Sequence, residues 1–160
     1  MARWLSMVSG LLPAGTAGDL EEGLRELAEL IRDVGGERIG PPDVHGNRVY
    51  VPLTARDGER YILRIIVERY LAEPPRCTFV DEHYQETPAA WPSPDPRGPF
   101  RAPTFICTPP TAEFYRYHRD RAYDPGEGTL ANTVATIFVA LNDVSGYSGR
   151  YRSARRGPAR

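Results

Sequence analysis

Cys107 and His118 are the residues of this 160-residue chain whose types and spacing best suit nucleophilic chemistry. Cys107 ends the short run Phe-Ile-Cys and is followed by Thr-Pro-Pro, which favours an exposed elbow. A thiolate attacks an acyl carbon readily and also leaves readily, which suits the transient formation of a thioester. If the following segment folds back, the His118 imidazole can take a proton from Cys107 or from an incoming amine.

Both residues also have a structural interpretation, which the sequence leaves open. Cysteine often packs as a small buried apolar residue, and a histidine in a polar segment is about as often a surface residue. Tyr115, Tyr117 and Asp120 are weaker candidates for positioning an amine, because a hydroxyl or a carboxylate can orient and desolvate it. Glu113, by contrast, is expected to face solvent.

The other cysteine and the other histidines are given no chemical role. Cys77 lies in a predicted strand and is expected to pack in the core, whereas His45 and His83 lie in predicted loops. Two cysteines cannot build a disulfide framework, and their spacing is not a zinc pattern. We therefore expect no metal and a reducing, cytoplasmic compartment.

Composition narrows the classes of partner. The net charge of −1 argues against a general nucleic-acid binder, and 41% apolar residues suffice for one folded domain. No apolar run approaches the roughly 20 residues that span a bilayer, so we expect no membrane partner. The apolar run 4–12 is expected to form a short helix or strand packed on the domain rather than a signal peptide, and residues 13–18 a linker or turn. Residues 146–160 contain five arginines and are predicted to be a flexible basic tail.

Helices are predicted near both ends of the domain. Asp19 caps the first helix, and Thr129 caps the last. A short helix is predicted to begin at Thr111. Apolar residues recur at helical spacing in the two long helices: Leu20, Leu24, Leu27, Leu30 and Ile31 in the first, and Leu130, Val134, Ile137, Phe138 and Leu141 in the last.

Three strands are predicted between these helices. Arg48–Leu53 and Arg60–Glu68 flank an Asp-Gly turn and form a hairpin. The second strand is apolar at nearly every position, so we expect it to be buried on both faces. Pro74-Pro75 turns the chain out of the sheet, Arg76–Asp81 re-enters it, and the proline-rich stretch 87–103 is an ordered loop.

The predicted fold class is therefore α+β, with an antiparallel meander sheet flanked by an N-terminal helix and a C-terminal helix. We divide the chain into an N-terminal segment, residues 1–18, one domain, residues 19–145, and the tail, residues 146–160.

This order of elements, together with local motifs, resembles the ubiquitin-conjugating (UBC-like) fold family and looks most like its divergent bacterial relatives. Family members carry a Tyr-Pro-x-x-Pro-Pro turn before a strand of the type Lys-Val-x-Phe. Here residues 70–75 read Tyr-Leu-Ala-Glu-Pro-Pro, and residues 76–79 read Arg-Cys-Thr-Phe. The family's active-site cysteine often ends an Ile-Cys run, here Ile106-Cys107. The family's His-Pro-Asn segment, whose Asn stabilises the oxyanion, is not present before Cys107, and no tryptophan follows it.

The resemblance implies a conjugating enzyme, that is, a transferase. Such an enzyme accepts a ubiquitin-like protein from an E1-like activating enzyme as a thioester on Cys107 and hands it to an amine of a target protein. The activating enzyme consumes the ATP, so the resemblance implies no cofactor for this chain.

Two other functions stay open. The first is a non-catalytic UBC-like module that binds a ubiquitin-like protein, which the missing His-Pro-Asn segment favours. The second is a Cys-His hydrolase with Cys107 and His118 as a dyad. Such hydrolases usually place the cysteine at a helix N-terminus, which Pro109-Pro110 disfavours here.

Overall fold

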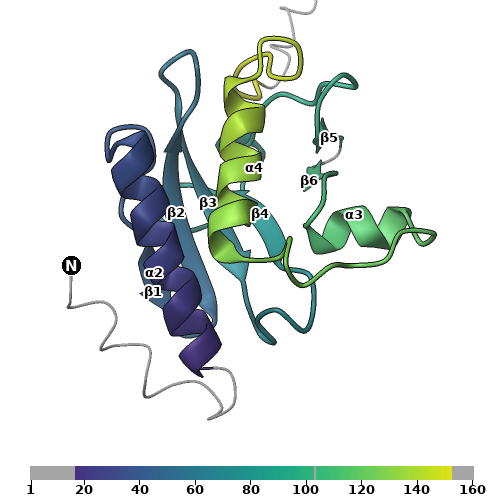
Figure 1. Ribbon diagram of the computed structural model, residues 1–160. Helices are drawn as coiled ribbons and strands as arrows, with labels where there is room; N and C mark the ends of the chain where they lie inside the picture. Colours follow the sequence, from purple (N-terminus) through teal and green to yellow (C-terminus); the bar gives the residue numbers. More distant parts are fainter. Residues whose placement is uncertain (1–16, 103, 153–160) are drawn as a thin grey trace, which may run out of the picture.

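The computed structural model describes residues 17–102 and 104–152. Helix α2 (Ala17–Val34) comes first, and a four-stranded antiparallel sheet follows. The sheet has the order β1-β2-β3-β4, and helix α4 (Leu130–Asn142) lies near the end of the described chain (Figure 1). The predicted α+β class with an antiparallel sheet and helices at both ends is confirmed.

Helix α2 begins two residues before the predicted cap Asp19 and buries the predicted leucine face. Leu20, Leu24 and Leu27 are fully buried. The helix ends at Gly35, whose φ of 110° lies in the left-handed region that favours glycine.

The sheet is a meander of consecutive strands. Its strands are β1 (Asp43–His45), β2 (Arg48–Thr54), β3 (Arg60–Ile66) and β4 (Arg76–Val80). The β2–β3 hairpin is confirmed, with Thr54 opposite Arg60 and Gly58 at φ 86° in the turn. The short strand β1 was not predicted, because three residues carry too little pattern.

The prediction that the second strand is buried on both faces is wrong. Along β3, fully buried residues alternate with half-buried ones, as in a sheet with one face on the core. Tyr61, Leu63 and Ile65 face the core, whereas Ile62 and Arg64 lie on the opposite face. Apolar residues therefore occur on both faces, but only one face is covered completely.

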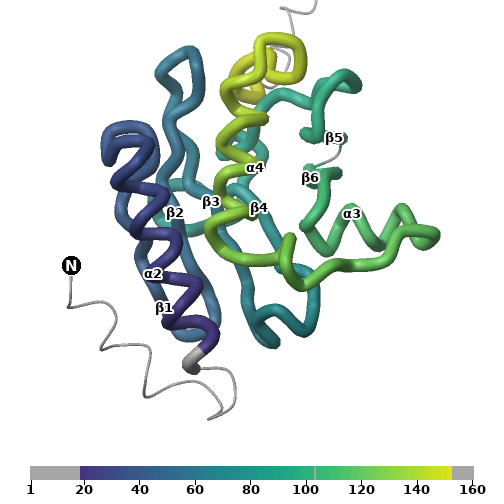
Figure 2. The backbone as a smooth tube through the Cα atoms, in the orientation of Figure 1, coloured from purple at the N-terminus to yellow at the C-terminus, as the bar shows by residue number. Residues whose placement is uncertain are grey.

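Helices α2 and α4 pack against each other on one face of the sheet (Figure 2). Thr129 caps α4 as predicted, accepting a hydrogen bond from the Asn132 backbone N–H. Tyr70 links the Pro-Pro turn to the start of α4, because its hydroxyl accepts a hydrogen bond from the Leu130 backbone N–H at 3.0 Å. A Cβ atom at Gly23 would lie 2.4 Å from that hydroxyl, so only glycine permits this close approach.

The proline-rich stretch runs beyond β4, at the edge of the sheet opposite to β1 (Figure 1). It contains the 3₁₀ turn η1 (Pro88–Ala90) and ends in a ribbon of β5 (Phe100–Arg101) and β6 (Phe105–Ile106). Trp91 and Phe100 are buried against Phe79 of β4, so aromatic side chains hold the loop on the core.

The prediction of a flexible tail from residue 146 is wrong for residues 146–152. Tyr147 is 1% exposed and shares a hydrogen bond of 2.8 Å with the Tyr61 hydroxyl. Arg150 pairs with Glu59, and the Tyr151 N–H donates to the Trp91 carbonyl. Tyrosine and arginine here make contacts that composition alone does not reveal.

Residues 153–160 lie outside the described residues, as does the N-terminal segment up to residue 16. Within the described parts of the chain, no helix is long and apolar enough to cross a membrane.

Candidate active site

Cys107 is carried by the β5–β6 ribbon, whose two faces differ. Phe100 and Ile106 are paired and fully buried in the core. Because side chains alternate along a strand, Phe105 and Cys107 point to the opposite, outer face. The Cys107 backbone N–H donates to the Pro99 carbonyl at 2.7 Å, so the ribbon's pairing continues to this residue. Cys107 is therefore partly exposed on a fixed backbone, as predicted for an elbow.

The segment after Cys107 folds back through a turn fixed by Thr111. Its buried hydroxyl lies 2.8 Å from both the Ile106 and the Thr108 carbonyl oxygens, and it also caps helix α3 (Ala112–Tyr117). Helix α3 then runs far enough to return His118 to the cysteine. The Cys107 Sγ and His118 Nε2 atoms lie 3.5 Å apart, a hydrogen bond whose donor depends on the histidine tautomer.

The His118 ring is held by an aromatic contact. It stacks on Phe114, one turn earlier in α3, with ring centroids 4.3 Å apart and planes 24° apart. No carboxylate of the described residues pairs with His118, in contrast to the acid of a catalytic triad. The pair is therefore a dyad oriented by packing.

Cys107 and His118 open into a groove of about 560 Å³. Phe105 and Tyr117 form one wall, with ring centroids 5.1 Å apart. The Pro-Asp-Pro segment 94–96, Phe100, Arg101 and Ala102 line the rest. The groove is thus mainly apolar, with Arg101 among its charged residues.

The Asp95–Arg97 pair stiffens the loop beside this groove. Asp95 is buried and accepts hydrogen bonds from the Arg97 backbone N–H and from its guanidinium at 2.8–3.0 Å. The hydrogen bonds from Arg97 hold the pKa of Asp95 at about 2, below its ordinary value. The charged groups of Asp95 and Arg97 are therefore paired with each other within this turn.

Two of the three weaker candidates, Tyr115 and Asp120, do not line the groove, whereas Tyr117 does. Tyr115 contacts Phe114 and Tyr123 instead, and burial raises its pKa. Asp120 is exposed in the turn that follows α3. The structure brings together Cys107 and His118 but places Tyr115 and Asp120 elsewhere.

The expectation that Glu113 faces solvent is wrong. Its carboxylate is largely buried beside the edge of β4, where it accepts a hydrogen bond from the Cys77 backbone, and burial raises its pKa. The Ala112 N–H donates to the Pro75 carbonyl at 2.9 Å, so the start of α3 covers this strand edge. Cys77 itself is buried, as predicted, and burial raises its pKa well above the ordinary value.

Tyr117 was among the weaker candidates of the sequence and lines the groove, whereas sequence reasoning missed Arg101 as a groove residue. The alternation of Phe-Ile-Cys would have placed Phe105 on the same face as Cys107. However, nothing local shows that Arg101 lies across the ribbon from Phe105, because the pairing depends on how the proline-rich loop closes.

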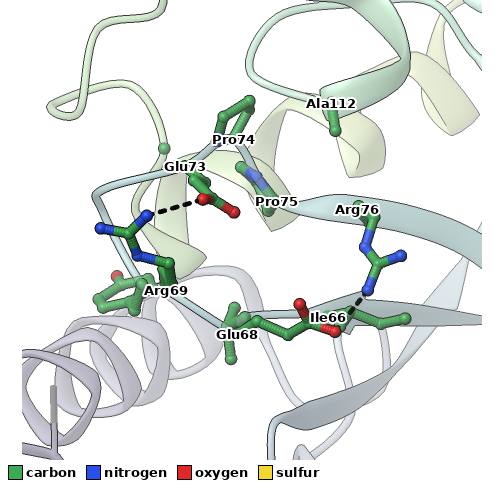
Figure 3. Close-up of a pocket in the computed structure, with 11 residues that line it drawn as sticks. Ile66, Glu68, Arg69, Glu73, Pro74, Pro75, Arg76 and Ala112 are labelled. Atoms are coloured by element: carbon green, nitrogen blue, oxygen red, sulfur yellow. Dashed lines mark hydrogen bonds and ion pairs between the residues drawn. The ribbon is translucent and has the colours of Figure 1, made fainter.

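A second, smaller pocket of about 220 Å³ lies at the Pro74-Pro75 turn (Figure 3). Ion pairs lie along it: Arg69 with Glu73, and Arg76 with Glu68. Neither Cys107 nor His118 lines this pocket, and its charged groups are already paired, so it offers less chemistry than the groove.

In the parts of the chain that the structure describes, no three His, Cys, Asp or Glu side chains are grouped to hold a metal ion. Comparisons with protein-family models, with curated proteins and with solved structures find no match.

Proposed function

We propose that this protein is a conjugating enzyme that carries a ubiquitin-like protein as a thioester on Cys107 and transfers it to an amine. The observation that carries the proposal is the 3.5 Å contact between Cys107 Sγ and His118 Nε2 in an open groove. The resemblance of the Pro-Pro turn, the Ile-Cys run and the element order to the UBC-like family supports the choice of substrate.

The chemistry consists of two acyl transfers. In the first, the Cys107 thiolate attacks the thioester of the charged activating enzyme, a new C–S bond forms, and the donor thiolate leaves. In the second, a target amine attacks the Cys107 thioester, an amide forms, and the thiolate of Cys107 leaves. His118 takes the proton of Cys107 in the first transfer and passes it to the departing donor thiolate, so that it can take the proton of the amine in the second.

A thioester relay suits the site better than amide hydrolysis. The Cys107 backbone N–H is bonded to Pro99, so it is not free to serve as an oxyanion donor. Cys107 also does not begin a helix, since α3 starts at Ala112. A relay makes smaller demands, because the group that leaves is a thiolate, a good leaving group, in both transfers.

The partners in this proposal are a ubiquitin-like protein, its activating enzyme and a target protein. ATP is consumed by the activating enzyme, so the chain acts without a cofactor. The absence of a His-Pro-Asn segment before Cys107 is the main departure from the family pattern. If no other group replaces it, the chain is a non-catalytic module that binds a ubiquitin-like protein.

A charging assay tests the proposal. The full chain is incubated with candidate ubiquitin-like proteins, the activating enzyme and ATP, and products are separated with and without thiol reductant. We expect a reductant-sensitive adduct that Cys107→Ala abolishes and that the matched control Cys77→Ala retains.

The alternatives give different results in the same assay. A binding module forms a stable complex but no adduct with a donor that charges another enzyme, and this result would overturn the catalytic proposal. A hydrolase releases free modifier from amide-linked substrates without accumulating an adduct in the absence of an amine.

A further inference from the structure

Arg101 is a cationic residue of the groove without a partner. Its Nε atom is shielded from solvent and has no hydrogen-bond partner among the residues that the structure describes. The ion pairs of the described chain involve other residues, and nearby Arg97 is committed to Asp95. A buried donor without an acceptor is costly, so such a group suggests a missing acceptor.

The register of the ribbon places Arg101 beside Cys107. Arg101 lies opposite Phe105, and the Cys107 N–H bonds to Pro99, so Arg101 and Cys107 occupy diagonal positions on the same outer face. Diagonal Cα atoms are about 7–8 Å apart, which an arginine side chain can bridge. Arg101, Cys107 and His118 all line the same groove.

We infer that Arg101 stabilises the oxyanion that forms when Cys107 attacks a thioester carbonyl, an inference that rests on the proposed function. As the Cys107 sulfur bonds to the carbonyl carbon, the C=O electron pair moves onto oxygen and the guanidinium donates hydrogen bonds to it. When the C–S bond to the donor breaks, that pair returns to the carbonyl, and the donor leaves as a thiolate.

Two features make arginine suitable for this role. The Cys107 backbone N–H, the usual donor beside a nucleophile, is occupied by Pro99. A guanidinium keeps its charge at all working pH values, and its planar donors are fixed before the reaction, so they need not reorganise as charge develops. Arg101 would thus supply the oxyanion stabilisation that an Asn before Cys107 provides in the UBC-like family.

Two reactions of the full chain separate this role from general activation of the thiol. Acylation of Cys107 by S-phenyl thioacetate passes through an oxyanion and transfers an acetyl group, releasing thiophenolate. Alkylation by iodoacetamide displaces iodide and forms no oxyanion. Rates for both reagents are followed by mass spectrometry of the Cys107 peptide, with the buried Cys77 as an internal reference.

We expect Arg101→Gln to slow acylation roughly ten- to hundred-fold while leaving alkylation unchanged, since an oxyanion donor contributes only to the first reaction. Arg101→Lys should restore part of the acylation rate because it keeps the charge. Arg119→Gln, which removes an exposed charge next to His118, should change neither rate.

Two outcomes would overturn the role of Arg101 and leave the proposed function standing. One is unchanged acylation in Arg101→Gln when the wild-type chain is acylated. The other is an equal fall in both rates, which would mean that Arg101 only shapes access to Cys107. Failure of the wild-type chain to be acylated by the thioester, although iodoacetamide modifies Cys107, would instead overturn the proposed function and this inference together.

Discussion

At the scale of single residues, the site depends on two contacts of His118. Its Nε2 atom reaches Cys107, and its ring stacks on Phe114. The stack takes the place of the acid that orients the histidine in a triad.

The proton-accepting role of His118 predicts slower reaction of the thiol when the imidazole is removed. In His118→Gln, the rate of Cys107 alkylation by iodoacetamide at neutral pH should fall about ten-fold, because the imidazole that accepts the thiol proton is gone. The exposed His83→Gln is the matched control and should react like the wild type. An unchanged rate in His118→Gln would leave His118 as a mere neighbour of the sulfur.

At the scale of elements, helix α3 links the sheet to the site. Its first turn covers the edge of β4 through Ala112 and Glu113, and its last residues carry His118 to the cysteine. An uncovered strand edge exposes unpaired backbone groups, so this contact also protects the sheet. The position of His118 therefore depends on the contact between Glu113 and β4.

Burial of Glu113 predicts a characteristic pH dependence of stability. Its pKa is raised in the folded state, so its contribution favours folding below the unfolded-state pKa and is lost as pH rises through the folded-state value. Relative to Glu113→Gln, the wild-type chain should gain free energy of unfolding as pH is lowered from 7 towards 5. Urea unfolding at both pH values measures the difference.

The exposed Glu127→Gln provides the control, with changes of less than about 0.5 kcal/mol and no such pH trend. Parallel pH profiles of wild type and Glu113→Gln would contradict the burial of this carboxylate.

At the scale of the whole molecule, residues 146–152 connect the end of α4 to the hairpin and the proline-rich loop. The Tyr147 hydroxyl donates to the Asp57 carboxylate at 3.0 Å and is bonded to Tyr61. The Arg150 guanidinium lies over the Tyr61 ring, 4.4 Å from its centroid. The Ser93 N–H donates to Gly149, which ties the loop before the groove to this segment.

These contacts predict that residues 146–152 contribute to stability. Tyr147→Phe should lower the free energy of unfolding by about 1–3 kcal/mol, because it leaves the buried Tyr61 hydroxyl without this hydrogen-bond partner. Tyr151→Phe is the control, since its backbone rather than its hydroxyl makes the recorded bond. A chain ending after Ser145 should lose more stability than one ending after Arg152, as measured by chemical unfolding. Equal stability of these two chains would show that the segment adds nothing.

The sequence determined the elements with strong local patterns. The leucine stripe of α2, the caps Thr111 and Thr129, and the Asp-Gly turn each act over a few residues, so their structure follows from local chemistry. The pairing of Cys107 with His118 was also predictable as a possibility, because only a fold-back of the short intervening segment was needed.

Only the tertiary structure decided which residues from distant segments come together. Arg101 shares a groove with Cys107 through strand pairing across the loop, Glu113 is buried because α3 covers the edge of β4, and Tyr147 is buried because it packs against the hairpin. Each of these contacts joins segments that have no local pattern in common. Their formation depends on which surfaces remain uncovered after the main elements have packed, and that information is not carried by any single stretch of sequence.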